Sequence, residues 1–234
     1  MYPDDAPEKI TSITLIVAFC NALSGSIAYG RLRRIDVRSG LLFSLAAIPG
    51  SIIGATITFY LSRGLFQIIF GIVLLLAAIY LLLRPTRRDD TGMIRGDWTR
   101  QMTDIYGVTV TFSYRRSAGI AIAFFIGIIS GLLGIGGGII HVPVLTQVLG
   151  FPVHIATATS QFVVSTTTFA ASITHFIAGN LTGVIGETLV LSAGAVIGAQ
   201  IGARFSHRVP GKVIIRLLAV ALAIVAIRLL INPL

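Results

Sequence analysis

Long apolar runs separated by short polar stretches dominate the chain. Seven such runs lie at 10–30, 40–61, 65–83, 118–150, 153–178, 184–204 and 211–231. At 1.5 Å per residue, the first run extends about 31 Å as a helix, which matches the hydrocarbon core of a bilayer. The pattern predicts an all-α integral membrane protein.

The run at 118–150 differs from the others because glycine interrupts it repeatedly. Each glycine costs a helix about 1 kcal/mol relative to alanine. A proline at 143 also removes a backbone donor and disfavours helix just before it. Backbone groups left unpaired in a membrane must be buried in protein or line a watered cavity. We therefore expect a broken helix here, made by Gly131, Gly134, Gly136, Gly137, Gly138 and Pro143.

Composition supports the membrane assignment. Hydrophobic residues make up 55% of the 234 residues, 12% are charged, and the mean hydropathy is +0.91. Soluble domains carry about 25% charged residues. The net charge of +9 does not indicate nucleic-acid binding, because arginine and lysine gather at the ends of apolar runs, as topology signals do.

The three runs of 1–83 recur in order within 153–234, although any two apolar segments share some likeness. The 84–117 loop and the glycine-rich run lie between them, so we divide the chain into a first repeat (1–83), a loop (84–117) and a second repeat (118–234). Such weak symmetry is typical of transporters with a substrate site between two repeats. The matches pair Pro7 with Pro152 and Thr14 with Thr159 at an offset of 145, and Gly50 and Gly54 with Gly194 and Gly198 at an offset of 144.

The repeat predicts that the first copy lacks its glycine-rich hairpin. Subtracting 145 from 118 places the counterpart of that run ahead of Met1. A start codon assigned too late and a naturally shortened chain would both produce this arrangement, and the two explanations stay open.

The arginines predict topology. Loops 31–38 and 84–117 are two crossings apart and together hold eleven arginines, which places them in the cytoplasm. If the run at 118–150 enters and returns, the basic residues divide 15 to 3 between the two sides, and if it crosses once they divide 12 to 6. The re-entrant alternative is favoured, and it makes the two repeats inverted. Alternation at 108–114 predicts a short hairpin strand in the loop.

The glycine motif and the next helix resemble the sulfite exporter TauE/SafE family. The resemblance rests on Gly131-x-x-Gly134-x-Gly136-Gly137-Gly138-x-x-x-Val142-Pro143, followed by Ala156-Thr-Ala-Thr-Ser160. It covers nearly the whole chain, apart from the first glycine-rich element. It implies a duplicated multi-pass protein of a bacterial or archaeal inner (cell) membrane that transports sulfite, sulfoacetate or other organosulfonates without a cofactor or metal.

A broken helix suits a small anion. A helix that restarts after the glycines presents free N–H groups and a positive dipole end, and glycine lets an oxygen approach the backbone. Close helix packing for the glycines and bonding to the i−4 carbonyl for the hydroxyls are the alternatives. The candidate substrate-binding residues are Gly136, Gly137, Gly138, His141, Thr157, Thr159, Ser160, Gln161, Ser165, Thr166, Asn21 and Ser24.

Three ionisable residues are candidates for a proton or charge role, with protons as a candidate coupling ion. Glu187 is the one acid within a predicted span, although an interfacial position also explains it. His175 also has an interfacial interpretation, and Arg31 has a topological one.

An enzyme is not expected, because four histidines and one cysteine show no metal-ligand or nucleophile–base spacing. An ion channel and a non-transporting membrane assembly subunit remain alternatives, and a homo-oligomer is compatible with the sequence.

Overall fold

The computed structural model describes residues 7–83, 96–134, 136–178 and 185–231. The first helices are α1 (Pro7–Arg31), α2 (Val37–Thr58) and α3 (Arg63–Leu83), and the last are α6 (Val153–Ile177), α7 (Ile185–Phe205) and α8 (Gly211–Ile231). Between them lie α4 (Arg116–Leu133) and α5 (Gly138–Gln147), and the short 3₁₀ helix η1 (Ser206–Arg208) joins α7 to α8. Within the described ranges six helices are long and apolar enough to cross a membrane, namely α1, α2, α3, α4, α7 and α8. The all-α membrane class is confirmed, whereas the segments 1–6 and 84–95 of the predicted repeat and loop lie outside the described residues.

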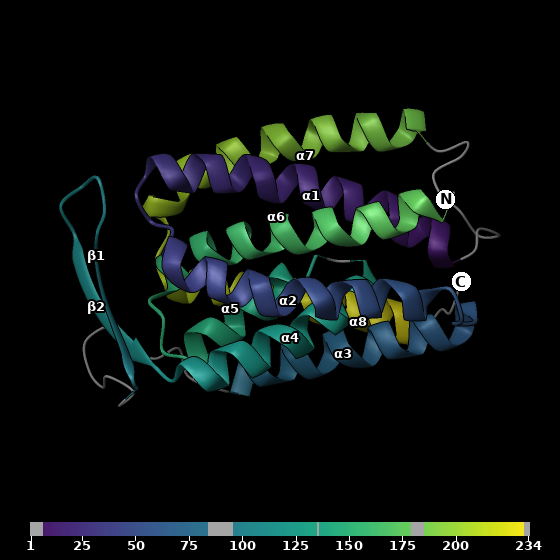
Figure 1. Cartoon of the computed structure of the whole chain (residues 1–234), viewed down its shortest axis with the longest axis horizontal. Coiled ribbons are helices and arrows are strands. Elements are labelled where there is room, and N and C mark those ends of the chain that lie inside the picture. Colours follow the sequence, from purple (N-terminus) through teal and green to yellow (C-terminus); the bar gives the residue numbers. More distant parts are fainter. Residues whose placement is uncertain (1–6, 84–95, 135, 179–184, 232–234) are drawn as a thin grey trace.

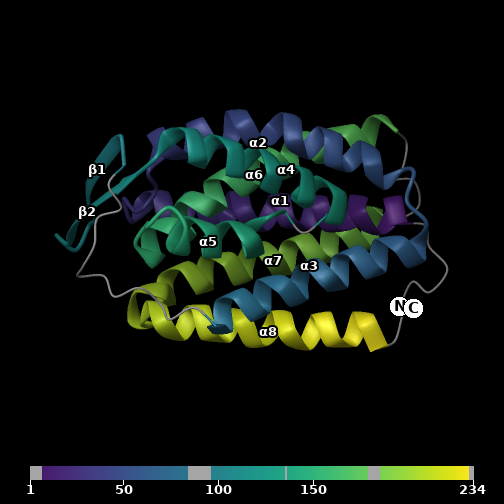
Figure 2. The same cartoon turned by 90° about the horizontal axis from the view of Figure 1, so that it is seen from below.

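The helices form one elongated bundle with α1 and α6 at its centre (Figures 1 and 2). Helix α1 packs along α6 and α7, α2 packs along α4 and α6, and α3 packs along α8. Tyr29 near the end of α1 clusters with Ala158 near the start of α6 and with Ala203 near the end of α7. The counterpart helices α1 and α6 therefore run antiparallel.

Helix α2 begins three residues earlier than the predicted run at 40–61. The Asp36 carboxylate accepts a hydrogen bond from the Ser39 backbone N–H, which caps the helix. Such a cap satisfies a donor that would otherwise lack a partner in the first turn. Arg38 consequently lies in the first turn of α2 and not in the loop before it.

The glycine-rich segment enters and leaves the bundle at the same end. Phe112 and Tyr114, just before α4, stack on Phe151, just before α6, with ring centroids 4.5 and 5.1 Å apart. The ten residues of α5 span only about 15 Å, too little to cross a bilayer. This path has the geometry of the re-entrant alternative, while the inverted repeat stays a prediction.

A two-stranded hairpin covers this end of the bundle. Strands β1 (Trp98–Thr103) and β2 (Thr109–Tyr114) pair antiparallel, with Trp98 opposite Tyr114 and Thr103 opposite Thr109. The strand predicted at 108–114 is confirmed, one residue shorter at its start.

Cysteine labelling tests the topology. Asp97→Cys and Lys212→Cys, in a Cys20→Ser background, should both react only from the cytoplasmic side. Both positions lie at the end of the bundle where the glycine-rich segment enters and leaves. Asp97 accepts a hydrogen bond from the Arg116 backbone N–H at the start of α4, and the start of α8, next to Lys212, packs on the start of α6. Tyr60→Cys, at the other end of α2, should react only from outside. Labelling of positions 97 and 212 from opposite sides would contradict the re-entrant path.

Candidate functional site

Two kinds of glycine make up the predicted break. Gly134, Gly136 and Gly137 have φ angles of 67°, 70° and 69°, a region that side chains with a Cβ rarely adopt. Gly131 lies inside α4, where an added methyl group would collide with the Ser51 carbonyl of α2. The break thus depends on three glycines, whereas Gly131 serves close helix packing.

Helix α5 starts directly after the break and continues through Pro143. Its N-cap is Gly137, whose carbonyl accepts from the His141 backbone N–H at 2.8 Å. The N–H groups of Gly138 and Ile139 precede this first α-helical bond, so they belong to the set without helical acceptors. The expectation that Pro143 disrupts the helix is wrong. Pro143 is buried, as are Leu145, Thr146 and Gln147 after it, and this burial compensates for one lost hydrogen bond.

The break is buried between helices. A methyl group at Gly136 would lie 2.9 Å from side-chain carbons of Val164 and Thr168 on α6, and one at Gly138 would lie 4.0 Å from the Ser160 hydroxyl. The cavity beside the break measures about 10 Å³, and the buried His141 lines it. That volume holds about one water molecule, so the break is closed.

Only part of the predicted site gathers at the break. Ser160 faces α5, and spacing of four residues places Val164 and Thr168 on the same face of α6. The predicted residues that lie together here are Gly136, Gly137, Gly138, His141 and Ser160.

The remaining hydroxyls of α6 have other partners. The Thr157 hydroxyl donates to the Val153 carbonyl at 2.8 Å, as its alternative interpretation expected. The Thr159 hydroxyl accepts from the Asp36 backbone N–H at 3.1 Å and fixes the turn before α2. The side chain of Gln161 packs on α1, where a methyl at Gly25 would lie 3.2 Å from it.

On α1, Ser24 contacts α7 instead of the break. Its hydroxyl donates to the Val196 carbonyl at 3.0 Å and accepts from Gln200 Nε2 at 2.9 Å. Asn21 is half-buried on the same helix.

The three ionisable candidates lie apart from the cavity at the break. His175, in the last turn of α6, is fully buried and packs nearly perpendicular to the Phe59 ring, with 5.0 Å between the ring centroids. Among the described residues neither of its ring nitrogens has a hydrogen-bond partner. Arg31, in the last turn of α1, and Glu187, in the first turn of α7, are exposed.

Sequence reasoning missed Ser130 and Thr168. Ser130, in the last turn of α4, lies against Gly137, and its buried hydroxyl has no partner among the described residues. Thr168 lies against Gly136 but donates to the Val164 carbonyl at 2.6 Å. Two steps of four residues from Ser160 would have indicated Thr168, whereas nothing in the pattern distinguishes Ser130.

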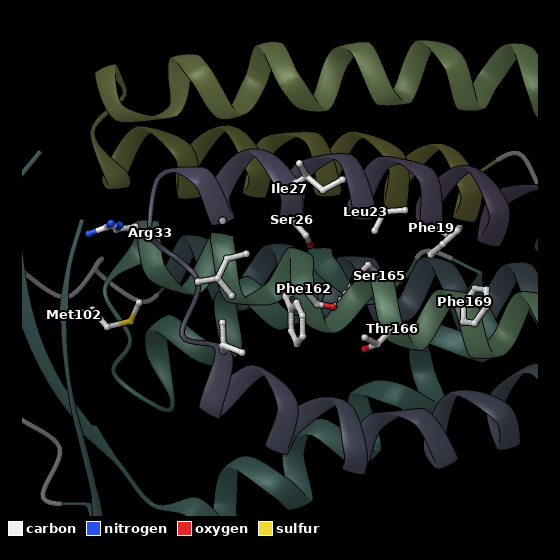
Figure 3. Close-up of a pocket in the computed structure, with 13 residues that line it drawn as sticks. Phe19, Leu23, Ser26, Ile27, Arg33, Met102, Phe162, Ser165, Thr166 and Phe169 are labelled. Carbon is white, nitrogen blue, oxygen red and sulfur yellow. Dashed lines mark hydrogen bonds between the residues drawn. The ribbon is translucent and has the colours of Figure 1, made fainter. Parts of the chain in front are cut away.

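A larger hollow of about 810 Å³ lies between α1, α2 and α6 (Figure 3). Ser165 and Thr166 line it, but their hydroxyls donate to the Phe162 and Val163 carbonyls at 2.8 and 2.7 Å. Aromatic and aliphatic side chains supply most of the wall, and Arg33 lies at one end. The hollow is apolar and therefore differs from the break in chemistry.

Ion pairs attach the β-hairpin to the arginine-rich end. Arg100 binds the buried Asp36 carboxylate at 2.8 Å, and Arg34 binds Asp104 at 2.9 Å. Burial acts to raise the pKa of Asp104, but Arg34 and two backbone N–H groups outweigh it and hold that pKa below its ordinary value. The bond to Asp36 raises the pKa of Arg100. The Asp104 carboxylate is therefore charged at neutral pH.

The chain is a multi-pass bundle in which a buried, glycine-broken helix lies between two sets of three helices in the sequence. This arrangement is typical of membrane transporters with discontinuous helices. Residues 4–229 match the family model of the sulfite exporter TauE/SafE. The chain belongs to this family and is a membrane transporter.

The chain is also similar in sequence to bacterial proteins named as probable membrane transporters. The chain is 32% identical to "Probable membrane transporter protein YunE" of Bacillus subtilis, over 98% of this chain and 83% of that protein. It is 26% identical to "Probable membrane transporter protein MamO" of Magnetospirillum gryphiswaldense over 78% of this chain, but it spans only 33% of that protein. No solved structure matches the chain.

Proposed function

We propose that this protein transports small sulfur-containing anions, with sulfite and organosulfonates such as sulfoacetate as the substrate class. The observation that carries the proposal is the start of α5 inside the bundle, after three glycines of positive φ and against Ser160. Backbone N–H groups and a helix dipole stabilise an anion there without a fixed positive charge. The family description supports sulfite in particular.

The closed break must open for an anion to bind. A cavity of about 10 Å³ has no room for a sulfite ion. Residues that absorb large φ/ψ changes serve as hinges, and the glycines on either side of residue 135 are suited to that role. Arginines at the end of the bundle that the β-hairpin covers raise the local concentration of anions. His141 is the ionisable side chain beside the break, and we propose it for proton coupling.

Gly138→Ala tests this site. An added methyl would lie 3.5 Å from Val164, an ordinary contact, and alanine favours helix, so the fold should persist. The methyl would stand between α5 and Ser160, and we expect sulfite uptake into proteoliposomes to fall about tenfold. Ser160→Ala should weaken uptake about fivefold, the worth of one hydrogen bond.

The control is Gly64→Ala, because a methyl at Gly64 meets nothing within 4 Å. Its uptake should equal that of the unaltered protein. Gly137 is unsuitable for this test, because its positive φ strains any side chain. Undiminished uptake of sulfite and sulfoacetate by a folded Gly138→Ala protein, with and without a pH gradient, would end the proposal.

A further inference from the structure

The apolar hollow of Figure 3 runs along α1 for the depth of about one lipid leaflet. Phe19 and Phe169 meet at one end of it, with 5.2 Å between their ring centroids. Arg33 and Met102 lie at the other end. From Phe19 to Gly30 the helix rises about 16 Å, which is about half of the hydrocarbon core of a bilayer. The hollow therefore has the length of an acyl chain, and its volume of about 810 Å³ is within the usual range for small-molecule sites.

The hollow is open along the side of the bundle. Its wall includes Leu23, Ile27 and Phe169, which are 42%, 48% and 52% exposed. In a bilayer, exposed side chains at this depth face hydrocarbon and not water. A lipid chain can therefore enter the hollow sideways, whereas a soluble anion meets an apolar wall.

Arg33 provides a positive charge at the polar end of the hollow. It is exposed and makes no ion pair among the described residues, whereas Arg34 beside it is paired with Asp104. Its φ of 55° lies in the left-handed region, and the Arg34 N–H bonds to the Tyr29 carbonyl around it. Glycine is the usual residue at this position of a helix end. An arginine in a conformation that favours glycine indicates a use for its side chain.

A second cavity continues from the end where Arg33 lies. It measures about 470 Å³ and shares Arg33 and Met102 with the hollow. Arg34, Asp104 and His154 also line it, so its wall is the more polar of the two. Because Arg34 and Asp104 balance each other, the charge of Arg33 remains uncompensated among the described residues. Arg33 thus stands between an apolar space and a polar one, as the phosphate does within a phospholipid.

Ser26 supplies a hydrogen-bond donor at the depth of a lipid ester. It is only 8% exposed, its hydroxyl has no partner among the described residues, and its oxygen points into the hollow (Figure 3). Buried hydroxyls in native proteins are nearly always bonded. Ser26 lies about 6 Å deeper along α1 than Gly30. The ester carbonyls of a phospholipid lie between its phosphate and its acyl chains, and so they would meet this hydroxyl.

We propose that the two cavities bind one anionic phospholipid of the leaflet predicted to be cytoplasmic. An acyl chain lies in the hollow, an ester carbonyl accepts from Ser26, and the phosphate binds Arg33 with the head group in the polar cavity. The cytoplasmic leaflet carries anionic lipids, and basic pockets between membrane helices bind their head groups. The site is separate from the glycine break, so it does not depend on which anion the protein transports.

The other occupants account for less. A free phosphate ion could bind Arg33, but it would leave the hollow and the Ser26 hydroxyl as they are. A second copy of the chain could cover the exposed wall by helix packing. That contact would bring no anion to Arg33.

Native mass spectrometry of the full chain, released from detergent micelles, tests the lipid class. The probes are dioleoylphosphatidylglycerol and dioleoylphosphatidylcholine, which share their acyl chains and differ in head-group charge. We expect a one-to-one complex that retains phosphatidylglycerol about tenfold more strongly, the worth of a charge-assisted hydrogen bond. Equal retention of the two lipids overturns the proposal.

Arg33→Gly tests the head-group contact. Glycine suits the positive φ, so the fold should persist while the preference for phosphatidylglycerol disappears. Arg38→Gln is the control, because Arg38 is exposed at the same end of the bundle and lines neither cavity. It removes the same charge and should leave the preference intact. An equal loss in both variants would assign the preference to general surface charge and overturn the proposal.

Leu23→Trp tests the acyl chain, because the larger side chain fills the hollow. Retention of both lipids should fall about tenfold, whereas Leu45→Trp should retain them, since Leu45 is 73% exposed on α2 and lines neither cavity. Equal thermal midpoints without lipid show that both variants are folded. Unchanged phosphatidylglycerol retention by Leu23→Trp overturns the proposal in favour of a soluble anion. Loss of a dimer instead of a lipid overturns it in favour of a second copy.

Discussion

Replacement of Asp36 by alanine is expected to lower the free energy of unfolding by about 3 kcal/mol. The Asp36 side chain is fully buried and accepts from Arg100 Nη2 at 2.8 Å and Nε at 3.1 Å. Removal of the carboxylate leaves the guanidinium, itself 19% exposed, without its counter-charge. The loss of one partner from a buried pair is strongly destabilising, even where the pair itself adds little net stability.

The effect should be large because the carboxylate joins the β-hairpin to the start of α2, and the backbone of the same residue bonds α6. It accepts from the Ser39 hydroxyl at 2.5 Å, and Ser39 in turn accepts from the Tyr114 hydroxyl at 2.6 Å. The Asp36 backbone N–H donates to Thr159 on α6. The β-hairpin, the start of α2 and the start of α6 therefore share one buried network, whose members depend on one another.

Thermal unfolding in detergent measures this effect. For a chain of this size, 3 kcal/mol corresponds to a fall of about 10 °C in the midpoint. Asp97→Ala is the control, because the Asp97–Arg116 pair has side chains 54% and 46% exposed and should contribute little. Asp36→Leu combined with Arg100→Met should recover part of the loss. A midpoint for Asp36→Ala equal to that of Asp97→Ala would contradict the assigned role.

The apolar runs predicted helix positions well because a membrane leaves few alternatives for a long apolar segment. Local chemistry accounts for the boundary errors. The Asp36 cap starts α2 ahead of Gly40, and α5 runs through Pro143 because burial within the bundle compensates for the lost bond. Alternation alone was sufficient to predict the strand at 108–114.

The site was predicted less completely, because α6 carries hydroxyls all around. Thr159, Ser160 and Gln161 are adjacent in sequence and point to α2, α5 and α1 respectively. Helical spacing predicts which residues share a face, but not which face meets the glycine break. Only the packing of α6 against its neighbours determines that rotation. For the same reason Ser130 became visible only once α4 was placed against α5.

The two roles of glycine also needed the fold. Sequence treated Gly131 and Gly137 as one cluster, yet the first needs the absence of a side chain for packing and the second needs a positive φ. Both requirements lead to glycine, so residue identity cannot distinguish them. The Gly-xxx-Gly spacing on α2 was informative in a different way, because its recurrence on α7 indicates the internal repeat.

Gly54→Ala is expected to destabilise the protein by about 3 kcal/mol, at the upper end of the range for overpacking. The added methyl would collide with the Ile128 carbonyl oxygen and lie 2.7 Å from the Leu132 nitrogen. These are backbone atoms of α4, so no side-chain rotation relieves the clash and the two helices must separate. The bond from the Thr58 hydroxyl to the Leu132 carbonyl, 2.9 Å long, would stretch with them.

Separation of α2 from α4 should also disturb the site, because the break begins at the residue after α4, Gly134. Gly54→Ala should therefore lose both thermal stability and sulfite uptake, whereas Gly138→Ala should lose uptake alone. Gly64→Ala, open on all sides, should retain both. Midpoint and uptake measured together on the three proteins distinguish helix packing from anion contact. A Gly54→Ala protein as stable as Gly64→Ala would show that α2 and α4 are not in backbone contact in the membrane.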